Sequence, residues 1–146
     1  MTFILNDEEQ MLRDSAKSFL KQTSPVSALR KLRDDKDPVG YSASVWSSMA
    51  EMGWCGVLVE EDHGGVDLGY TAAGLLLQEM GRTLCASPFL PTAVLSASAL
   101  RLAGSDAQKS AWLPKIASGE AVIAFAVDEK ARHNPERIDT LSLIHI

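Results

Sequence analysis

Apolar side chains recur every three or four residues along most of this chain, which is the spacing of one face of an α-helix. The first such segment follows Asn6, whose side chain can cap a helix while Glu9 reaches back in a capping-box arrangement. The apolar stripe of this segment contains Met11, Leu12, Ala16, Phe19 and Leu20. We therefore predict an amphipathic helix that begins at Asn6.

Serine, proline and glycine residues divide the next part of the chain into further helical segments. Ser24 and Pro25 are typical of a helix start, and Gly53 and Gly104 are typical of helix ends. The predicted helices cover residues 25–32, 42–53 (starting at Ser42 or Ser44), 71–81, 92–103 and 106–112. A polar loop is expected over residues 34–40.

Two short segments have the composition of extended chain. Residues 54–59 are apolar and partly β-branched, and residues 60–65 then form a polar loop ending in two glycines. Residues 121–127 follow Gly119 and are the strongest strand candidate. Because a lone strand lacks a pairing partner, we predict a mainly α fold, with a helical domain over residues 1–119 and the start of a β domain over 120–140. Residues 141–146 fit no continuation and are interpreted as an artefactual or disordered tail.

Composition narrows the classes of function. The chain has 146 residues, 46% of them hydrophobic, which is enough to bury a core. Its 14 Lys and Arg against 19 Asp and Glu give a net charge of -5, which disfavours nucleic acid or an anionic membrane as the main partner. The longest apolar run, residues 121–127, is too short to span a bilayer, and the first residues lack the basic flank of a secretory signal. We interpret the protein as cytoplasmic.

Metal and disulfide chemistry are not predicted. The two cysteines, Cys55 and Cys85, form no CxxC pair, and the three histidines are scattered without metal-ligand spacing. No self-contained catalytic motif is present. Both cysteines lack a basic neighbour that would lower a thiol pKa, so we interpret them as buried fillers.

Two polar groupings allow both a chemical and a structural interpretation. The segment from Glu60 to His63 could be an acid–base cluster, but four polar residues before two glycines are more often a solvated turn. Gly64, Gly65 and Gly69 could cradle a phosphate through backbone N–H groups at the start of the next helix. No Lys, Ser or Thr stands at P-loop spacing, so the structural interpretation is favoured for both.

Three tryptophans raise the same question. Trp46, Trp54 and Trp112 could form a stacking platform for a ligand. Each falls on an apolar helix face or beside a helix end. Packing in the core is therefore the favoured interpretation.

Two motifs resemble those of the acyl-CoA dehydrogenases. Residues 53–65, GWCGVLVEEDHGG, followed by LG at 68–69, are similar to G-x-x-G-[LV]-x-[VI]-P-E-E-[YH]-G-G-x-G-L. Residues 104–109 (GSDAQK), 112–115 (WLPK) and 117–120 (ASGE) are similar to G-[ST]-x-x-Q-K-x-x-[WY]-L-P-x-[LI]-A-x-G-E. The order of the motifs, their separation and the switch from helix to strand after the second make the joint match specific. The resemblance covers residues 6–140.

This resemblance implies a fold and a chemistry. The family has an N-terminal helical domain, a middle β domain and a second helical bundle, with FAD between the last two. A carboxylate takes the α proton of an acyl-CoA thioester while hydride passes from the β carbon to the flavin. The carboxylate usually comes from the C-terminal bundle, which this sequence lacks. We therefore assign no catalytic residue and expect this chain alone to be inactive.

The resemblance also supplies candidate binding residues. Residues 124–129, AFAVDE, align with the family's A-[FY]-[AC]-[LV]-T-E, which makes Phe125, Val127 and Asp128 candidates for contact with FAD. Asp128 departs from the family's threonine, and a carboxylate donates no hydrogen bond unless it is protonated. In the family, the helix before the turn at residue 104 forms part of the acyl-chain wall, so Pro91 and Leu95 are candidates for substrate contact.

The leading hypothesis is the N-terminal portion of an FAD-dependent acyl-CoA dehydrogenase that forms a 2,3-enoyl-CoA. Its implied partners are an acyl-CoA substrate, an electron-transfer flavoprotein or similar acceptor, and further subunits in a homo- or hetero-oligomer. The alternative is a non-catalytic helical subunit of a heteromeric complex. An apolar face exposed on this chain is expected where further domains would pack.

Overall fold

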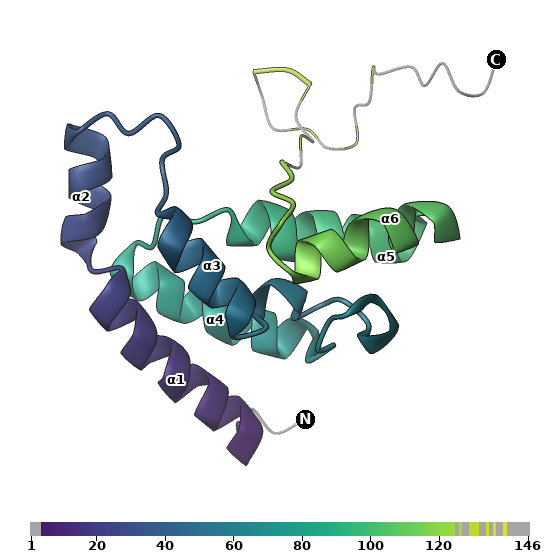
Figure 1. Cartoon of the computed structure of the whole chain (residues 1–146), viewed down its shortest axis with the longest axis horizontal. Helices are drawn as coiled ribbons and strands as arrows, with labels where there is room; N and C mark the ends of the chain where they lie inside the picture. The colour runs from purple at the N-terminus through teal and green to yellow at the C-terminus, as the bar shows by residue number, and fades with distance from the viewer. Residues whose placement is uncertain are drawn as a thin grey trace.

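A computed structural model describes residues 4–124, 126, 129–131, 134, 136 and 139 of the chain. Its regular elements are helical, as the apolar spacing predicts (Figure 1). The α-helices are α1 (Asp7–Thr23), α2 (Val26–Asp34), α3 (Ala43–Glu51), α4 (Gly69–Thr83), α5 (Ala97–Ala103) and α6 (Asp106–Ala117). Two 3-10 turns, η1 (Trp54–Gly56) and η2 (Glu61–His63), join α3 to α4, and a π-helical segment, η3 (Leu90–Ser96), leads into α5.

Helix α1 starts with the predicted capping box. The Asn6 side chain accepts from the backbone N–H of Glu9 at 2.8 Å, and the Glu9 carboxylate accepts from the backbone N–H of Asn6 at 3.0 Å. Three acidic residues in the first turn and Lys21 in the last turn complement the helix dipole. Sequence signals three residues apart therefore fix where this helix begins.

The larger core lies between α1, α3 and α4, and α1 packs along α4 (Figure 1). Helix α4 buries Leu76 and Met80, and η1 adds Trp54, against which Phe19 of α1 packs edge-on at 5.4 Å between ring centroids. Cys55 also lies in this core, and burial raises the pKa of its thiol to about 12. Cys55 is thus a neutral, shielded filler, as predicted, whereas Cys85 is only half-buried.

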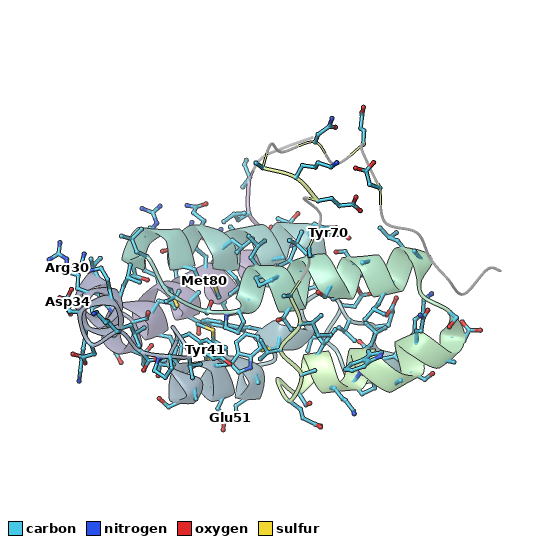
Figure 2. All side chains as sticks on the ribbon, turned by 90° about the horizontal axis from the view of Figure 1, so that it is seen from above. Arg30, Asp34, Tyr41, Glu51, Tyr70 and Met80 are labelled. Carbon is cyan, nitrogen blue, oxygen red and sulfur yellow. The ribbon has the colours of Figure 1, made fainter. Side chains whose placement is uncertain are left out.

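Helix α2 stands apart from the other helices at one end of the molecule (Figure 1). The structure describes all of its residues, and none of them is buried. Its apolar side chains, such as Leu29 and Leu32, are half-buried. Arg30 and Asp34 lie at its outer edge, away from the other helices (Figure 2). The helix begins at Val26, one residue later than predicted, and Ser24 caps the end of α1 instead.

The prediction of an extended segment over residues 54–59 is wrong. Gly53 adopts a left-handed conformation with φ of 77°, which turns the chain into η1 and buries Trp54 to Val59. These apolar residues suggested a strand, but they are buried because tight turns place them inside the core. The N–H of Val66 donates to the carbonyl of Gly56 at 3.0 Å, and the N–H of Asp67 donates to the carbonyl of Val59 at 3.0 Å, so the loop folds back over these turns.

The last helices, α5 and α6, lie side by side and cover a second, smaller core (Figure 1). Ser105 and Gln108 form a capping box at the start of α6, where a cap was predicted. The helix continues past the predicted end near Trp112 to Ala117, with Pro114 inside it. Leu113, Ile116 and Ala117 need this extension, because they are the residues that α6 buries.

The predicted strand is not present in the described residues. Residues 121–124 and 126 have no regular secondary structure. A strand is defined by a paired neighbour, and in this segment the backbone of Ile123 pairs with a side chain instead. The mainly helical fold is confirmed, whereas Phe125, Val127 and Asp128 lie outside the described residues.

Candidate functional site

The π-helical segment η3 carries both predicted acyl-wall residues. Pro91 lacks a backbone N–H, and the buried hydroxyl of Ser96 donates to the carbonyl of Pro91 at 2.7 Å. Short π-helical insertions widen a helix and occur frequently at functional sites. On this segment Leu90 is 45% exposed and Leu95 is 39% exposed, while Pro91 is half-buried. An irregular helix thus presents apolar side chains at the surface.

A cavity of about 500 Å³ lies between α5, α6 and the segment that follows α6. Its lining is mostly apolar and consists of Ser96, Ala99, Leu100, Trp112, Val122, Ile123 and Ala124. Neither Pro91 nor Leu95 lines this cavity, although both lie on the segment that supplies Ser96. The structure therefore does not place the predicted wall residues in this cavity.

Trp112 corrects one prediction about the tryptophans. Trp46 and Trp54 are buried as predicted, but Trp112 is 45% exposed on the wall of this cavity. The ammonium of Lys115, one helical turn away, lies 5.6 Å from the centroid of the Trp112 ring. An indole left open beside an apolar cavity suits contact with another apolar surface.

The segment after α6 is hydrogen-bonded to α3, to α6 and to η3. The indole N–H of Trp46 donates to the carbonyl of Gly119 at 2.9 Å, and the N–H of Ala121 donates to the carbonyl of Lys115 at 2.9 Å. The hydroxyl of Thr92 then donates to the carbonyl of Ile123 at 3.1 Å and accepts from the N–H of Ile123 at 3.0 Å. We call residues 118–123 the exit segment.

Arg101 ties α5 to the loop before α4. Its guanidinium donates to the Glu60 carboxylate at 2.9 Å and to the carbonyl of Leu58 at 2.7 Å, and lies 3.1 Å from the Asp67 carboxylate. The pKa of Glu60 is held below its ordinary value by its own backbone N–H and by Arg101, against a burial that raises it. Glu60 is therefore held as the ion-pair partner of Arg101.

The glycines of this loop serve packing. Backbone carbonyls accept from the N–H groups of Gly64 (2.8 Å), Gly65 (3.1 Å) and Gly69 (3.3 Å), so these groups are not open to a phosphate. A Cβ atom on Gly65 would lie 1.9 Å from the carbonyl oxygen of Val59. The structural interpretation of the paired glycines is thus confirmed. The hydroxyl of Tyr70, at the start of α4, donates to the hydroxyl of Ser98 at 2.9 Å, which joins α4 to α5.

Neither Thr92 nor Arg101 was predicted from the sequence. A lone threonine in an apolar helix and a lone arginine near a helix end carry no local signal, because their partners lie 31 and 41 residues away in the chain. Within the described part of the chain, no group of three His, Cys, Asp or Glu side chains could hold a metal ion. No described helix combines the length and apolar character that crossing a bilayer requires.

Solved structures of other proteins share this fold. The chain aligns with a chain of the ChsE4-ChsE5 complex from Mycobacterium tuberculosis with a TM-score of 0.80, covering 92% of this chain and 36% of that one at 24% identity. It also aligns with an acyl-CoA dehydrogenase complexed with FAD from Bacillus anthracis, with a TM-score of 0.69 over 90% of this chain and 22% of that one at 23% identity. These likenesses show the fold.

The sequence comparisons then give the family. Residues 6–120 match the family described as acyl-CoA dehydrogenase, N-terminal domain. Acyl-CoA dehydrogenase FadE12 of Mycobacterium tuberculosis is 29% identical over 143 residues, which are 95% of this chain and 35% of that relative. The chain belongs to the acyl-CoA dehydrogenase family, and it spans about a third of the length of FadE12.

Proposed function

We propose that this chain is the N-terminal portion of an FAD-dependent acyl-CoA dehydrogenase that oxidises the Cα–Cβ bond of an acyl-CoA thioester to the 2,3-enoyl-CoA. The observation that carries the proposal is the family match over residues 6–120, which covers the helices from α1 to α6. In this proposal the chain supplies part of the enclosure of the acyl group and contacts between subunits, and it is inactive alone.

The acyl-chain wall is proposed to be the exposed side of η3, with Pro91 and Leu95 as its contacts. The support for this wall is its exposed apolar surface. An acyl chain binds by burying apolar surface, and Leu95 together with Leu90 offers that surface on a segment whose backbone is held by Ser96. A separate apolar cavity, lined by Ser96 at the end of η3, lies beside Trp112 and the exit segment.

FAD is proposed for the longer protein rather than for these helices. When bound, FAD supplies an acceptor for two electrons. Around the cavity the described polar side-chain groups are the Ser96 hydroxyl and the Trp112 indole, which do not form a site for a charged dinucleotide. Phe125, Val127 and Asp128 remain the proposed cofactor contacts, on the resemblance alone. An electron-transfer flavoprotein or similar acceptor, and a homo- or hetero-oligomeric assembly, are proposed on the same ground.

Flavin spectroscopy tests this proposal. The proposal requires a longer gene product, and that protein should show the visible absorbance of oxidised flavin and lose it when acyl-CoA is added without oxygen. The 146-residue chain should bind no flavin and leave acyl-CoA unchanged. A longer product that is purified folded and flavin-free would contradict the proposal.

The wall is tested by a matched pair of variants in the same protein. Leu95→Trp should lower kcat/KM for long acyl chains more than for short ones, because the larger side chain fills the space of the chain end. Leu102→Trp is the control, since Leu102 is a leucine 83% exposed near the end of α5 and is not among the proposed wall residues. Equal effects of the two variants on all chain lengths would remove Leu95 from the wall.

The alternative function is a non-catalytic helical subunit of a heteromer. The fold match to a chain of the ChsE4-ChsE5 complex keeps this alternative in view, and so does the carboxylate of Asp128 where the family has a threonine. The two functions differ in a direct observation. A subunit of this kind would be purified with a second, different chain, and the flavin would be lost when that chain is removed.

A further inference from the structure

We propose that Thr92 is a positioning residue, whose hydroxyl fixes the main chain at Ile123 and so sets the spacing between η3 and the segment beyond it. The link itself is independent of the proposed function, but its consequence for an acyl-CoA dehydrogenase rests on that function. No sequence motif marks this pair, which is separated by 31 residues in the chain.

One side chain satisfies both backbone groups of one residue. Thr92 is fully buried, and its Oγ1 donates to the carbonyl oxygen of Ile123 at 3.1 Å and accepts from the N–H of Ile123 at 3.0 Å. A neighbouring strand would supply these two bonds from its own backbone. The hydroxyl therefore takes the place of a strand partner at the point where the chain leaves the helices.

The geometry requires a hydroxyl at this position. A hydroxyl can donate one bond and accept others at the same oxygen, whereas valine, which has nearly the same shape, can do neither. Losing both bonds would leave a carbonyl and an N–H of the exit segment without partners beside the apolar side chains of the second core. Serine keeps the hydroxyl and loses one methyl group.

Thr92 lies on the same segment as the proposed acyl-chain wall. Thr92 follows Pro91 directly and precedes Leu95 by three residues, so it belongs to the same π-helical segment as the proposed wall. Its N–H donates to the carbonyl of Pro88 at 3.0 Å, which fixes the residue to the start of that segment. The other hydrogen bonds described between the exit segment and the helices come from α3 and α6, whereas Thr92 connects the segment to η3.

On the proposed function, this spacing controls how the substrate meets the cofactor. Phe125, Val127 and Asp128, the proposed flavin contacts, follow Ile123 within five residues of sequence. A shift between the wall and this stretch would misalign the acyl chain with the cofactor, and displacements of about 1 Å can cost on the order of a hundredfold in rate.

Amide hydrogen exchange of the 146-residue chain tests the link without any flavin. In the wild type the amide of Ile123 should exchange at least about tenfold more slowly than that of Val122, for which the described residues offer no acceptor. Thr92→Val should remove this protection, and Thr92→Ser should restore most of it. Thr83→Val is the matched control, because the Thr83 hydroxyl bonds to the carbonyl of Met80 within its own helix.

The outcomes separate the link from the function. Equal exchange at Ile123 and Val122 in the wild type would overturn the link, even if Thr92→Val fails to fold. Circular dichroism shows whether each variant is folded. In the longer enzyme, Thr92→Val should lower kcat by about tenfold or more, and Thr92→Ser should recover it to within about threefold. A slow Ile123 amide in a protein that never binds flavin would leave the link intact and refute the proposed function, whereas full activity of Thr92→Val would refute the positioning role alone.

Discussion

Helices α4 and α2 have similar apolar spacing but differ in how deeply their apolar residues are buried. Helix α4 buries six residues, among them Leu76 and Met80, whereas α2, which the structure describes completely, buries none. Leu32 of α2 lines a cavity of about 510 Å³, which is lined in part by charged residues of the following loop. Amphipathic spacing thus tells which face turns inward, while the depth of burial depends on whether another helix covers that face.

The difference in burial predicts the largest contrast between the two helices. Leu76→Ala should destabilise the chain by about 3 to 4 kcal/mol, because it leaves a cavity in the core, whereas Leu32→Ala in α2 should cost about 1 kcal/mol. Urea unfolding followed by circular dichroism measures both values. Equal losses would mean that α2 is as tightly packed as α4.

Two left-handed glycines allow a similar comparison between a packed and an open position. Gly119 has φ of 74°, and a Cβ there would lie 2.6 Å from Cβ of Ala50, whereas Gly40 has φ of 78° with nothing within 4 Å. Both alanine variants carry the backbone strain of about 1 kcal/mol, but Gly119→Ala also overpacks and should cost about 3 kcal/mol in total. Thermal unfolding of the two variants compares them directly, and a loss at Gly40 equal to that at Gly119 would refute the contrast.

Substitutions of Arg101 in α5 and Arg33 in α2 should differ less in their effect on stability. Arg101→Met removes bonds to Glu60 and to the carbonyl of Leu58 and should destabilise the chain by about 1 to 2 kcal/mol. Arg33→Met in α2 removes an exposed pair with Asp34 and should cost under about 0.5 kcal/mol. A double-mutant cycle with Glu60→Gln isolates the Arg101 pair, and a coupling energy near zero would contradict its role.

The smallest expected effect is a pH dependence. Because the folded-state pKa of Glu60 lies below its ordinary value of 4.5, its charged form favours the folded state. This contribution is present above pH 4.5 and is lost as the pH falls through the lower folded-state pKa. Wild type should therefore lose slightly more stability than Glu60→Gln between pH 7 and pH 3. Asp34→Asn is the control, and an identical acid response of wild type and Glu60→Gln would contradict the prediction.

Short-range signals in the sequence predicted where α1 and α6 begin. The capping boxes at Asn6 with Glu9 and at Ser105 with Gln108 involve residues three apart, so the sequence alone contains both partners. The turns over residues 54–59 were missed because Gly53 and the loop that packs back on Val59 decide them. Local apolar composition cannot distinguish a strand from buried turns when distant contacts choose between them.

The candidate site was predictable only through the resemblance. Pro91 and Leu95 came from the family's pattern, and the structure adds that they lie on a π-helical segment next to a cavity that they do not line. Thr92 has an ordinary helical neighbourhood in the sequence, and its role depends on a backbone 31 residues later. The exposure of Trp112 likewise depends on which segments pack against α6, and its local sequence does not contain that information.

The anchoring of Gly119 by Trp46 decides how this helical unit can be shortened. A protein cut after Ala117, where the last helix ends, would leave a buried indole N–H without its acceptor and Thr92 without its partner. In the ribbon of Figure 1 the chain after α6 leaves the helices as an irregular trace, yet residues 118–123 are hydrogen-bonded to α3, α6 and η3. A shortened version of this unit that keeps both bonds therefore extends through Ile123.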